Sequence, residues 1–118
     1  MKFKYFLNEA VKTTVRPKNK VELKKIIEET IKEQGFNCDL NFIDTSLIKD
    51  MSYLFYNTEF NGDISKWDVS NVKDMSCMFE FSRFNKDISK WNVSNVRKIR
   101  GMFNYSSLEG NEPDWYKD

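Results

Sequence analysis

The segments DISKWDVSNV (63–72) and DISKWNVSNV (87–96) differ at one residue and begin 24 positions apart. A degenerate copy begins at Asp39, and a partial copy follows from Asn111. Self-similarity at a fixed period is the signature of a repeat protein. The chain therefore contains three units, 39–62, 63–86 and 87–110. Their shared apolar residues are Phe60 with Phe84, Ile64 with Ile88, Trp67 with Trp91 and Trp115, Val69 with Val93, Val72 with Val96, Met78 with Met102, and Phe79 with Phe103.

The first half of each unit has the alternation of a short strand. In the second unit, Trp67 and Val69 lie two residues apart, a spacing typical of a strand with one buried face. Aromatic and β-branched residues favour that setting. The preceding stretch, FNGD at 60–63, contains glycine and Asx residues and predicts a turn.

The second half of each unit has the spacing of a helix. Apolar residues of the second unit recur there at intervals of three and four, at Val72, Met75, Met78 and Phe79. This spacing is typical of one buried helix face, and Ser70 or Asn71 is a suitable N-cap. Strand, turn and helix together make one coil of a solenoid. No coil can bury its apolar face alone, so stacking is required.

The N-terminal third predicts a helical cap on this stack. Asn19 is a suitable N-cap with Glu22 three residues later, and Gly35 is a suitable terminator. The apolar stripe of this helix, over about 20–34, is Leu23, Ile26, Ile27 and Ile31. Residues 1–15 fit either a strand or a helix. We expect a single domain over 1–118, with a cap at 1–38, repeats at 39–110 and a partial repeat or C-terminal cap at 111–118.

The repeats also follow a recognisable pattern, F-N-x-D-I-S-x-W-x-V-S-N-V-x-x-M-x-x-M-F. It runs from Phe60 to Phe79 and recurs from Phe84 to Phe103, with Ile99 in place of the first methionine. This pattern resembles the BspA-like leucine-rich-repeat surface-protein family over about 39–110. The resemblance implies a leucine-rich-repeat solenoid, protein binding or adhesion in surface-exposed members, and no catalytic residues. The expected fold class is α/β: a short leucine-rich-repeat-like solenoid of strand-turn-helix coils with a helical N-terminal cap.

Three repeated residue types invite a functional interpretation, and each has a structural one. The tryptophans suit a stacking platform for bases or sugars, but their strict repetition beside valines favours a buried ladder. The methionines suit an adaptable groove, but their spacing favours the core. Asp39, Asp63 and Asp87 suit calcium, but the paired glycines of calcium-binding repeats are absent, which favours turn capping.

The composition limits the classes of function that we expect for the chain. The 118 residues include 19 Lys and Arg against 18 Asp and Glu, so the net charge of +1 supplies no global field for nucleic acid or an anionic membrane. The chain has no histidine, the commonest general base and metal ligand. Cys38 and Cys77 are too few for a disulfide framework. We expect no enzyme, no catalytic residues, no cofactor and no metal.

The strand interpretation places two rows of residues on an outward face. If the side chains of residues 43, 67 and 91 point inward, the residues on either side point outward. The first row is Phe42, Lys66 and Lys90, and the second row is Asp44, Asp68 and Asn92. Solenoids often bind partners through such a face, although an ordinary solvated face has the same pattern. Our leading hypothesis is a non-enzymatic protein–protein interaction module that binds a protein partner through this strand face and its loops.

Two alternative functions are also consistent with the sequence. The third unit is basic, with a patch of Arg97, Lys98 and Arg100, which suits a nucleic-acid binder through this repeat. No aromatic residues interleave with the patch, which makes nucleic acid the less favoured partner. A small compact chain also suits a phage or mobile-element inhibitor that occludes a host defence enzyme such as a CRISPR nuclease.

The N-terminal sequence bears on location. Its apolar run ends at Leu7, which is shorter than a secretory signal requires. No stretch approaches the length of a membrane span. We expect a cytoplasmic protein, or a cell-surface protein if a leader has been removed from the chain.

Overall fold

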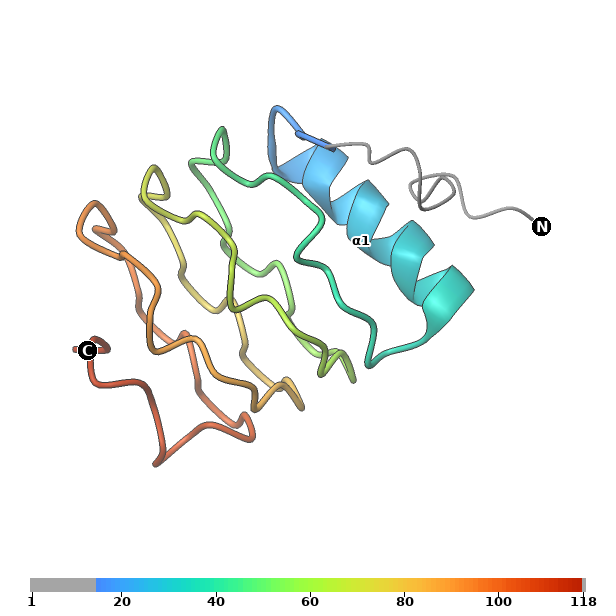
Figure 1. Ribbon diagram of the computed structural model, residues 1–118. Coiled ribbons are helices and arrows are strands. Elements are labelled where there is room, and N and C mark those ends of the chain that lie inside the picture. Colours follow the sequence, from blue (N-terminus) through green and yellow to red (C-terminus); the bar gives the residue numbers. More distant parts are fainter. Residues whose placement is uncertain (1–14, 118) are drawn as a thin grey trace.

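The structure, a computed structural model, describes residues 15–117 (Figure 1). Within that range its one helix is α1, Lys20–Gln34, and the rest consists of turns and irregular backbone. The described residues form no sheet, only three isolated parallel bridges that join Val15 to Ile43, Asp50 to Asp74, and Asp74 to Lys98. The expected fold class, an α/β leucine-rich-repeat-like solenoid of strand-turn-helix coils, is therefore wrong. The predicted ambiguity over residues 1–15 lies almost wholly outside the described residues.

Helix α1 begins and ends where its capping residues stand. The Asn19 side chain accepts a hydrogen bond from the Glu22 N–H (3.0 Å), and the Glu22 carboxylate accepts one from the Lys18 N–H (2.8 Å). At the other end, Gly35 has a φ of 91° and donates its N–H to Ile31 O (2.7 Å). Glycine adopts such a conformation without the steric penalty of a Cβ. This helix is too short and too polar to cross a bilayer.

The three repeats lie side by side as stacked coils, drawn in green, yellow and orange in Figure 1. Backbone hydrogen bonds join each coil to the next at a constant offset. Met51 N donates to Asp74 O (2.9 Å), and its counterpart Met75 N donates to Lys98 O (2.8 Å). The same relation holds from Tyr53 to Ser76, Cys77 to Arg100, Phe55 to Met78 and Phe79 to Met102. Stacking therefore follows the sequence repeat residue by residue.

Turns replace the predicted strand in the first half of each coil. Trp67 N donates to Ile64 O (3.2 Å), and Val72 N donates to Val69 O (3.0 Å). Such bonds between residues three apart close β-turns, which bring the intervening apolar residues to one side. The carboxylate of Asp68 accepts the Ser70 N–H (3.0 Å), an Asx turn that competes with extended pairing. The alternation of Trp67 and Val69 was too short a signal to distinguish these turns from a strand.

Turns also replace the predicted helix in the second half. Met78 N donates to Met75 O (3.2 Å), but Cys77 has a φ of 55° and Phe81 a φ of 58°. Left-handed residues reverse the chain and cannot continue a right-handed helix. Asn71, expected to cap a helix, instead donates its side-chain amide to Ser46 O in the preceding coil (2.7 Å). A spacing of three and four arises here because successive turns aim every third or fourth side chain inward.

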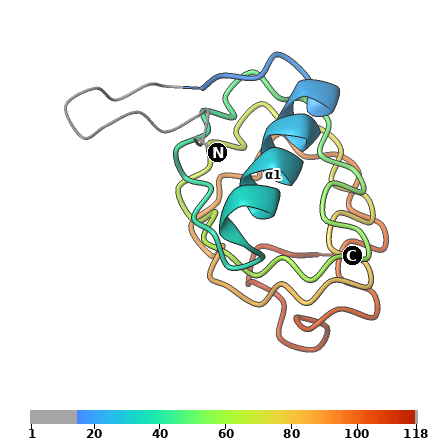
Figure 2. The same ribbon diagram turned by 90° about the vertical axis from the view of Figure 1, so that its right-hand side faces the viewer.

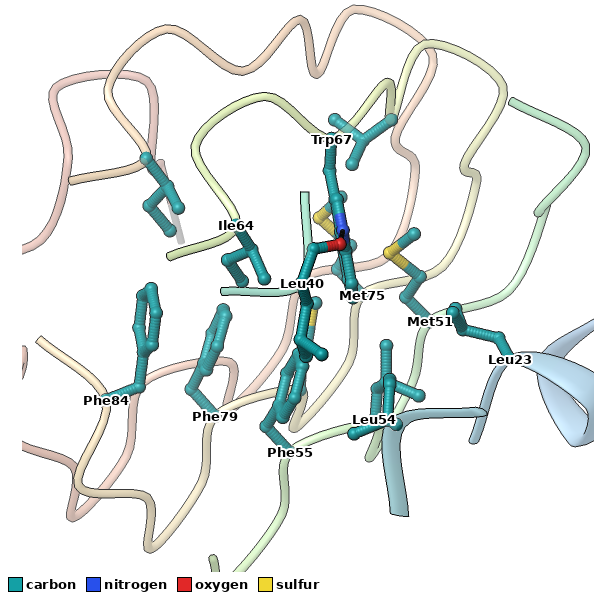
Figure 3. Close-up of a cluster of buried hydrophobic side chains, with 14 of the residues drawn as sticks. Leu23, Leu40, Met51, Leu54, Phe55, Ile64, Trp67, Met75, Phe79 and Phe84 are labelled. Atoms are coloured by element: carbon teal, nitrogen blue, oxygen red, sulfur yellow. Dashed lines mark hydrogen bonds between the residues drawn. The ribbon is translucent and has the colours of Figure 1, made fainter. Parts of the chain in front are cut away.

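The interior of the stack is a set of aromatic columns (Figure 3). Phe55, Phe79 and Phe103 stack with centroids 5.6 Å apart at both steps. The indoles of Trp67, Trp91 and Trp115 stack at 6.5 and 6.3 Å. Each indole N–H donates to a carbonyl of the preceding coil, at Leu40, Ile64 and Ile88. The predicted buried ladder is confirmed, with Trp67 and Trp91 buried and Trp115 half-buried.

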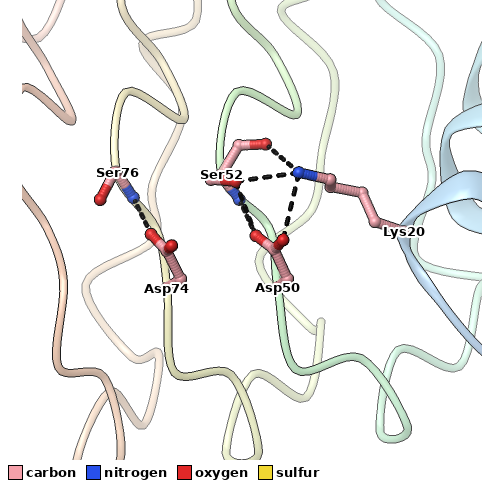
Figure 4. Close-up of polar contacts among 5 residues, drawn as sticks. All are labelled: Lys20, Asp50, Ser52, Asp74 and Ser76. Atoms are coloured by element: carbon pink, nitrogen blue, oxygen red, sulfur yellow. Dashed lines mark hydrogen bonds and ion pairs between the residues drawn. The ribbon is translucent and has the colours of Figure 1, made fainter.

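Helix α1 lies across the N-terminal end of the stack (Figures 1 and 2). Its Leu23, Ile26 and Ile27 belong to the same buried cluster as the first coil. Lys20 adds a polar contact: its Nζ lies 2.9 Å from Ser52 Oγ, 3.0 Å from Ser52 O and 3.3 Å from Asp50 Oδ2 (Figure 4). The first coil is thus covered on its outer side.

Candidate functional site

The two predicted rows occupy equivalent positions in successive coils, but they do not lie on strands. In the first row, Lys66 and Lys90 are exposed, whereas Phe42 is half-buried and packs against the core. The side chains of the second row accept hydrogen bonds within local turns. Asp44 accepts from the Ser46 N–H (3.0 Å) and pairs with Arg16 Nε (3.0 Å). The other two members, Asp68 and Asn92, accept from Ser70 and Ser94.

The predicted basic patch lies on the last full coil. Arg97, Lys98 and Arg100 are all exposed. Their backbone holds this coil to the preceding one, because Arg97 N donates to Lys73 O (2.8 Å) and Arg100 O accepts from Cys77 N (3.0 Å). The three side chains therefore extend from a backbone segment that is hydrogen-bonded to the preceding coil.

A contiguous surface feature that the sequence reasoning missed is an aromatic ridge of Tyr53, Tyr56, Phe81 and Tyr105. These side chains are among the most exposed apolar residues of the described chain, at 51%, 43%, 46% and 70%. The Tyr53 and Tyr56 rings meet edge to face at 5.5 Å, and Tyr56 meets Phe81 at 6.0 Å. Phe81 and Tyr105 stack at 5.0 Å with an interplanar angle of 9°. The ridge therefore crosses all three coils.

The backbone under the ridge is strained. Tyr53, Phe81 and Tyr105 have φ values of 60°, 58° and 57°. A left-handed conformation costs an ordinary L-residue about 1–2 kcal/mol, and bulky side chains rarely adopt it. In the first coil the position equivalent to Phe81 and Tyr105 is Asn57, with a φ of 51°, and asparagine tolerates this region well. Strained residues often gather at functional sites.

A shallow groove of about 550 Å³ runs beside the ridge. Phe81 and Tyr105 form its aromatic side. Its polar side comes from the adjoining turns: Asn57, Thr58, Glu59, Ser82, Arg83, Ser106 and Ser107. The hydroxyl oxygens of Thr58, Ser82 and Ser106 each accept the N–H two residues later, so each turn is held by a side-chain hydrogen bond. The groove offers both hydrogen-bonding groups and the opposite charges of Glu59 and Arg83.

The titratable groups of the coils serve mainly as turn caps. Asp39, Asp63 and Asp87 accept N–H groups from two residues on, which confirms the capping interpretation. Hydrogen bonds from the Asn41 amide and from Ser65 lower the pKa of Asp63 from 3.8 to about 2. Burial raises the pKa of the Cys38 and Cys77 thiols, so the thiolate fraction falls. Among residues 15–117, no group of carboxylates and thiols has the arrangement of a metal site.

One signal in the sequence points to the ridge. Residues 81 and 105 are aromatic at a position where the first unit has Asn57, although their neighbours Glu80 and Asn104 are polar. An aromatic residue outside the apolar pattern of its repeat is a candidate for the surface.

Comparison with known proteins places the chain in a family. No curated protein and no solved structure matches it. A family model described as "Mycoplasma protein of unknown function, DUF285" matches residues 22–117, which include α1, all three coils and the partial repeat. This match supports a relationship to repeat proteins of the BspA-like kind without identifying the particular repeat motif. The chain belongs to the DUF285 family.

Proposed function

We propose that the protein is a non-enzymatic module that binds another protein through the aromatic ridge and its adjoining groove. The observation that carries this proposal is the exposure of four contacting rings, two of which, Phe81 and Tyr105, occupy left-handed positions where the first coil has Asn57. Tyrosine and phenylalanine are enriched at protein interfaces, where a few aromatic anchors supply most of the binding energy. The groove adds the polar groups found at the rim of such interfaces.

A protein partner fits this surface better than a base or a sugar. Nucleobases and sugars stack on open ring faces. Here the Phe81 and Tyr105 rings cover one face of each other, and Tyr53 and Tyr56 meet edge to face. The ridge therefore offers mainly ring edges and outer faces, which suit insertion between the side chains of a protein surface.

The test uses the residue that the chain itself places at the equivalent position. Phe81→Asn with Tyr105→Asn copies Asn57, so the left-handed backbone is retained and the melting temperature should stay unchanged or rise slightly. Partners captured by immobilised wild-type protein from a lysate of the source organism would be identified by mass spectrometry, purified and titrated. We expect the double variant to bind at least thirtyfold more weakly, because two aromatic anchors are lost.

The control is Lys66→Glu with Lys90→Glu, which changes exposed residues of the predicted row in the same two coils. It should bind the partner within about threefold of the wild-type protein, as expected for residues outside the contact. Failure to capture any protein, or loss of binding in the control but not in the asparagine variant, would refute binding through the ridge.

A further inference from the structure

The last coil repeats the backbone of the earlier coils, but no other coil within residues 15–117 lies on its outer side. The bridges Asp50–Asp74 and Asp74–Lys98 form a series that ends at Lys98. In each bridge, the residue of the earlier coil lies between the two backbone groups that form the hydrogen bonds. On either side of Asp50, Lys49 O accepts from Lys73 N, and Met51 N donates to Asp74 O. The equivalent groups of the last coil are Arg97 O and Ile99 N, and no partner within residues 15–117 bonds either of them. We call residues 97–101 the open edge.

Apolar side chains beside the open edge are less buried than the equivalent side chains of the second coil. Val69, Val72 and Met75 are buried in the second coil, with exposures of 1%, 0% and 0%. Their equivalents in the third coil, Val93, Val96 and Ile99, are only partly buried. The partial repeat covers a different part of this end, where Tyr116 lies against Phe103 at 5.0 Å.

In the third coil, two positions of the edge carry positive charges that the first two coils do not have there. The first two coils have aspartate at positions 50 and 74 and serine at positions 52 and 76, and each aspartate accepts the serine N–H. Figure 4 shows this arrangement in both coils. The third coil has Lys98 and Arg100 instead, next to Arg97. Three exposed cations within four residues therefore flank the open backbone groups.

We propose that the open edge binds an extended acidic segment of a partner protein. The guest backbone would donate to Arg97 O and accept from Ile99 N, which repeats the pairing of the inner coils, a recognised mode of peptide binding. Its carboxylates would pair with Arg97, Lys98 and Arg100, and its apolar side chains would cover Val96 and Ile99.

The chain supplies a precedent for a carboxylate in this series. Asn57 N donates to Glu80 O, and Phe81 N donates to Asn104 O. The equivalent donor of the third coil is Tyr105 N. Tyr105 N donates to the carboxylate of Glu109 (3.1 Å). One donor of the outer side is thus already satisfied by an acidic side chain of the chain itself.

Other occupants fit less well. A second copy joined edge to edge would bring its own three cations against these, and such repulsion disfavours association. A copy joined head to tail is blocked, because α1 covers the opposite end and Lys20 occupies Ser52 O. Nucleic acid would use the cations, but a phosphate chain has no amide to donate to Arg97 O.

The experiment measures binding of a fluorescent peptide of alternating glutamate and valine to the full chain by anisotropy. Lys98→Asp with Arg100→Ser restores the residues of the inner coils, so it should fold normally. We expect it to bind at least tenfold more weakly than the wild-type protein. The control, Lys86→Asp with Lys90→Ser, makes the same change in net charge at two other exposed residues and should bind within about threefold of the wild-type protein.

Amide hydrogen exchange in the wild-type protein gives an independent readout. The peptide should slow exchange at Ile99, while a peptide with lysine in place of glutamate should leave it unchanged. Equal weakening in both variants, binding without protection at Ile99, or displacement of the peptide by self-association would overturn the proposal. So would an oligonucleotide that binds more tightly than the peptide and depends on the same two cations.

Discussion

At the scale of single residues, Gly62 shows how closely neighbouring segments approach. A Cβ at this position would collide with the backbone carbonyl oxygen of Cys38 and lie 2.8 Å from the Phe60 ring. Backbone cannot move aside as a flexible side chain can, so only glycine fits. The position equivalent to Gly62 in the next coil is Lys86, which is exposed.

Gly62→Ala should therefore lower the free energy of unfolding by about 3 kcal/mol, at the upper end of overpacking effects. The matched control, Lys86→Ala, should change it by no more than about 0.5 kcal/mol. Urea denaturation followed by tryptophan fluorescence measures both, and similar values for the two variants would contradict the close approach.

The residue scale also explains why the sequence did not reveal the turns. Tyr53, Cys77 and Phe81 have positive φ, but none is a residue type that signals it. Among the three coils, glycine gives the signal only at Gly101 and Gly110, with φ values of 70° and 90°. Left-handed tyrosine and phenylalanine are held there by the stacked neighbours, which a reading of local propensity does not include.

At the scale of the element, the unit of structure is the coil, and its stability depends on its neighbours. The same repeat position is buried in the second coil and partly exposed in the third, as Val69 and Val93 show. In a stack whose coils contact only their neighbours, the cost of a substitution follows the number of covered sides.

Val69→Ala should accordingly cost about 2 kcal/mol of unfolding free energy, because it leaves a cavity in the core. Val93→Ala removes the same atoms from a partly solvated site and should cost less than about 1 kcal/mol. Chemical denaturation of the two variants in parallel makes the comparison, and equal costs would show that the outer side of the third coil is covered.

The elements were predicted unevenly from the sequence. The helix at 20–34 was predictable because Asn19, Glu22 and Gly35 act locally, within a few residues of where they stand. The strand and helix within each coil were predicted wrongly, since a repeated pattern of buried residues reports which side chains face inward but not the backbone that turns them there. Tryptophan burial was predictable because it depends only on the inward direction.

At the scale of the whole molecule, carboxylates cap turns in every coil, and their ionisation is linked to folding. Hydrogen bonds hold the pKa of Asp63 at about 2, and hydrogen bonds from serines lower the pKa values of Asp44, Asp50 and Asp87. A depressed folded-state pKa stabilises the protein above the unfolded-state value, and that contribution is lost as pH falls through the folded-state value.

The urea midpoint should therefore fall as the pH is lowered from about 4 to about 2, with little change between about 5 and 7 from these groups. Asp63→Asn keeps an oxygen that accepts the Ser65 N–H but removes the titration, so its midpoint should fall less steeply over the acid range. A wild-type midpoint that stays constant down to about pH 2 would contradict the linkage.

The candidate sites emerge only at this scale. The ridge joins rings from three coils, and the open edge exists because the third coil has no neighbour within the described residues. The sequence marked Arg97, Lys98 and Arg100 as basic, but not their place beside Arg97 O and Ile99 N. The rows at 42, 66 and 90 and at 44, 68 and 92 assumed a strand, which is absent from the described residues.

The constant offset of the hydrogen bonds between coils has a genetic consequence. Recombination between the near-identical stretches at 63–72 and 87–96 would delete or insert one whole coil, and the backbone hydrogen bonds that join successive coils would keep the same offset. Insertion or deletion of a complete repeat would thus preserve the register between coils, whereas insertions of any other length would disrupt it.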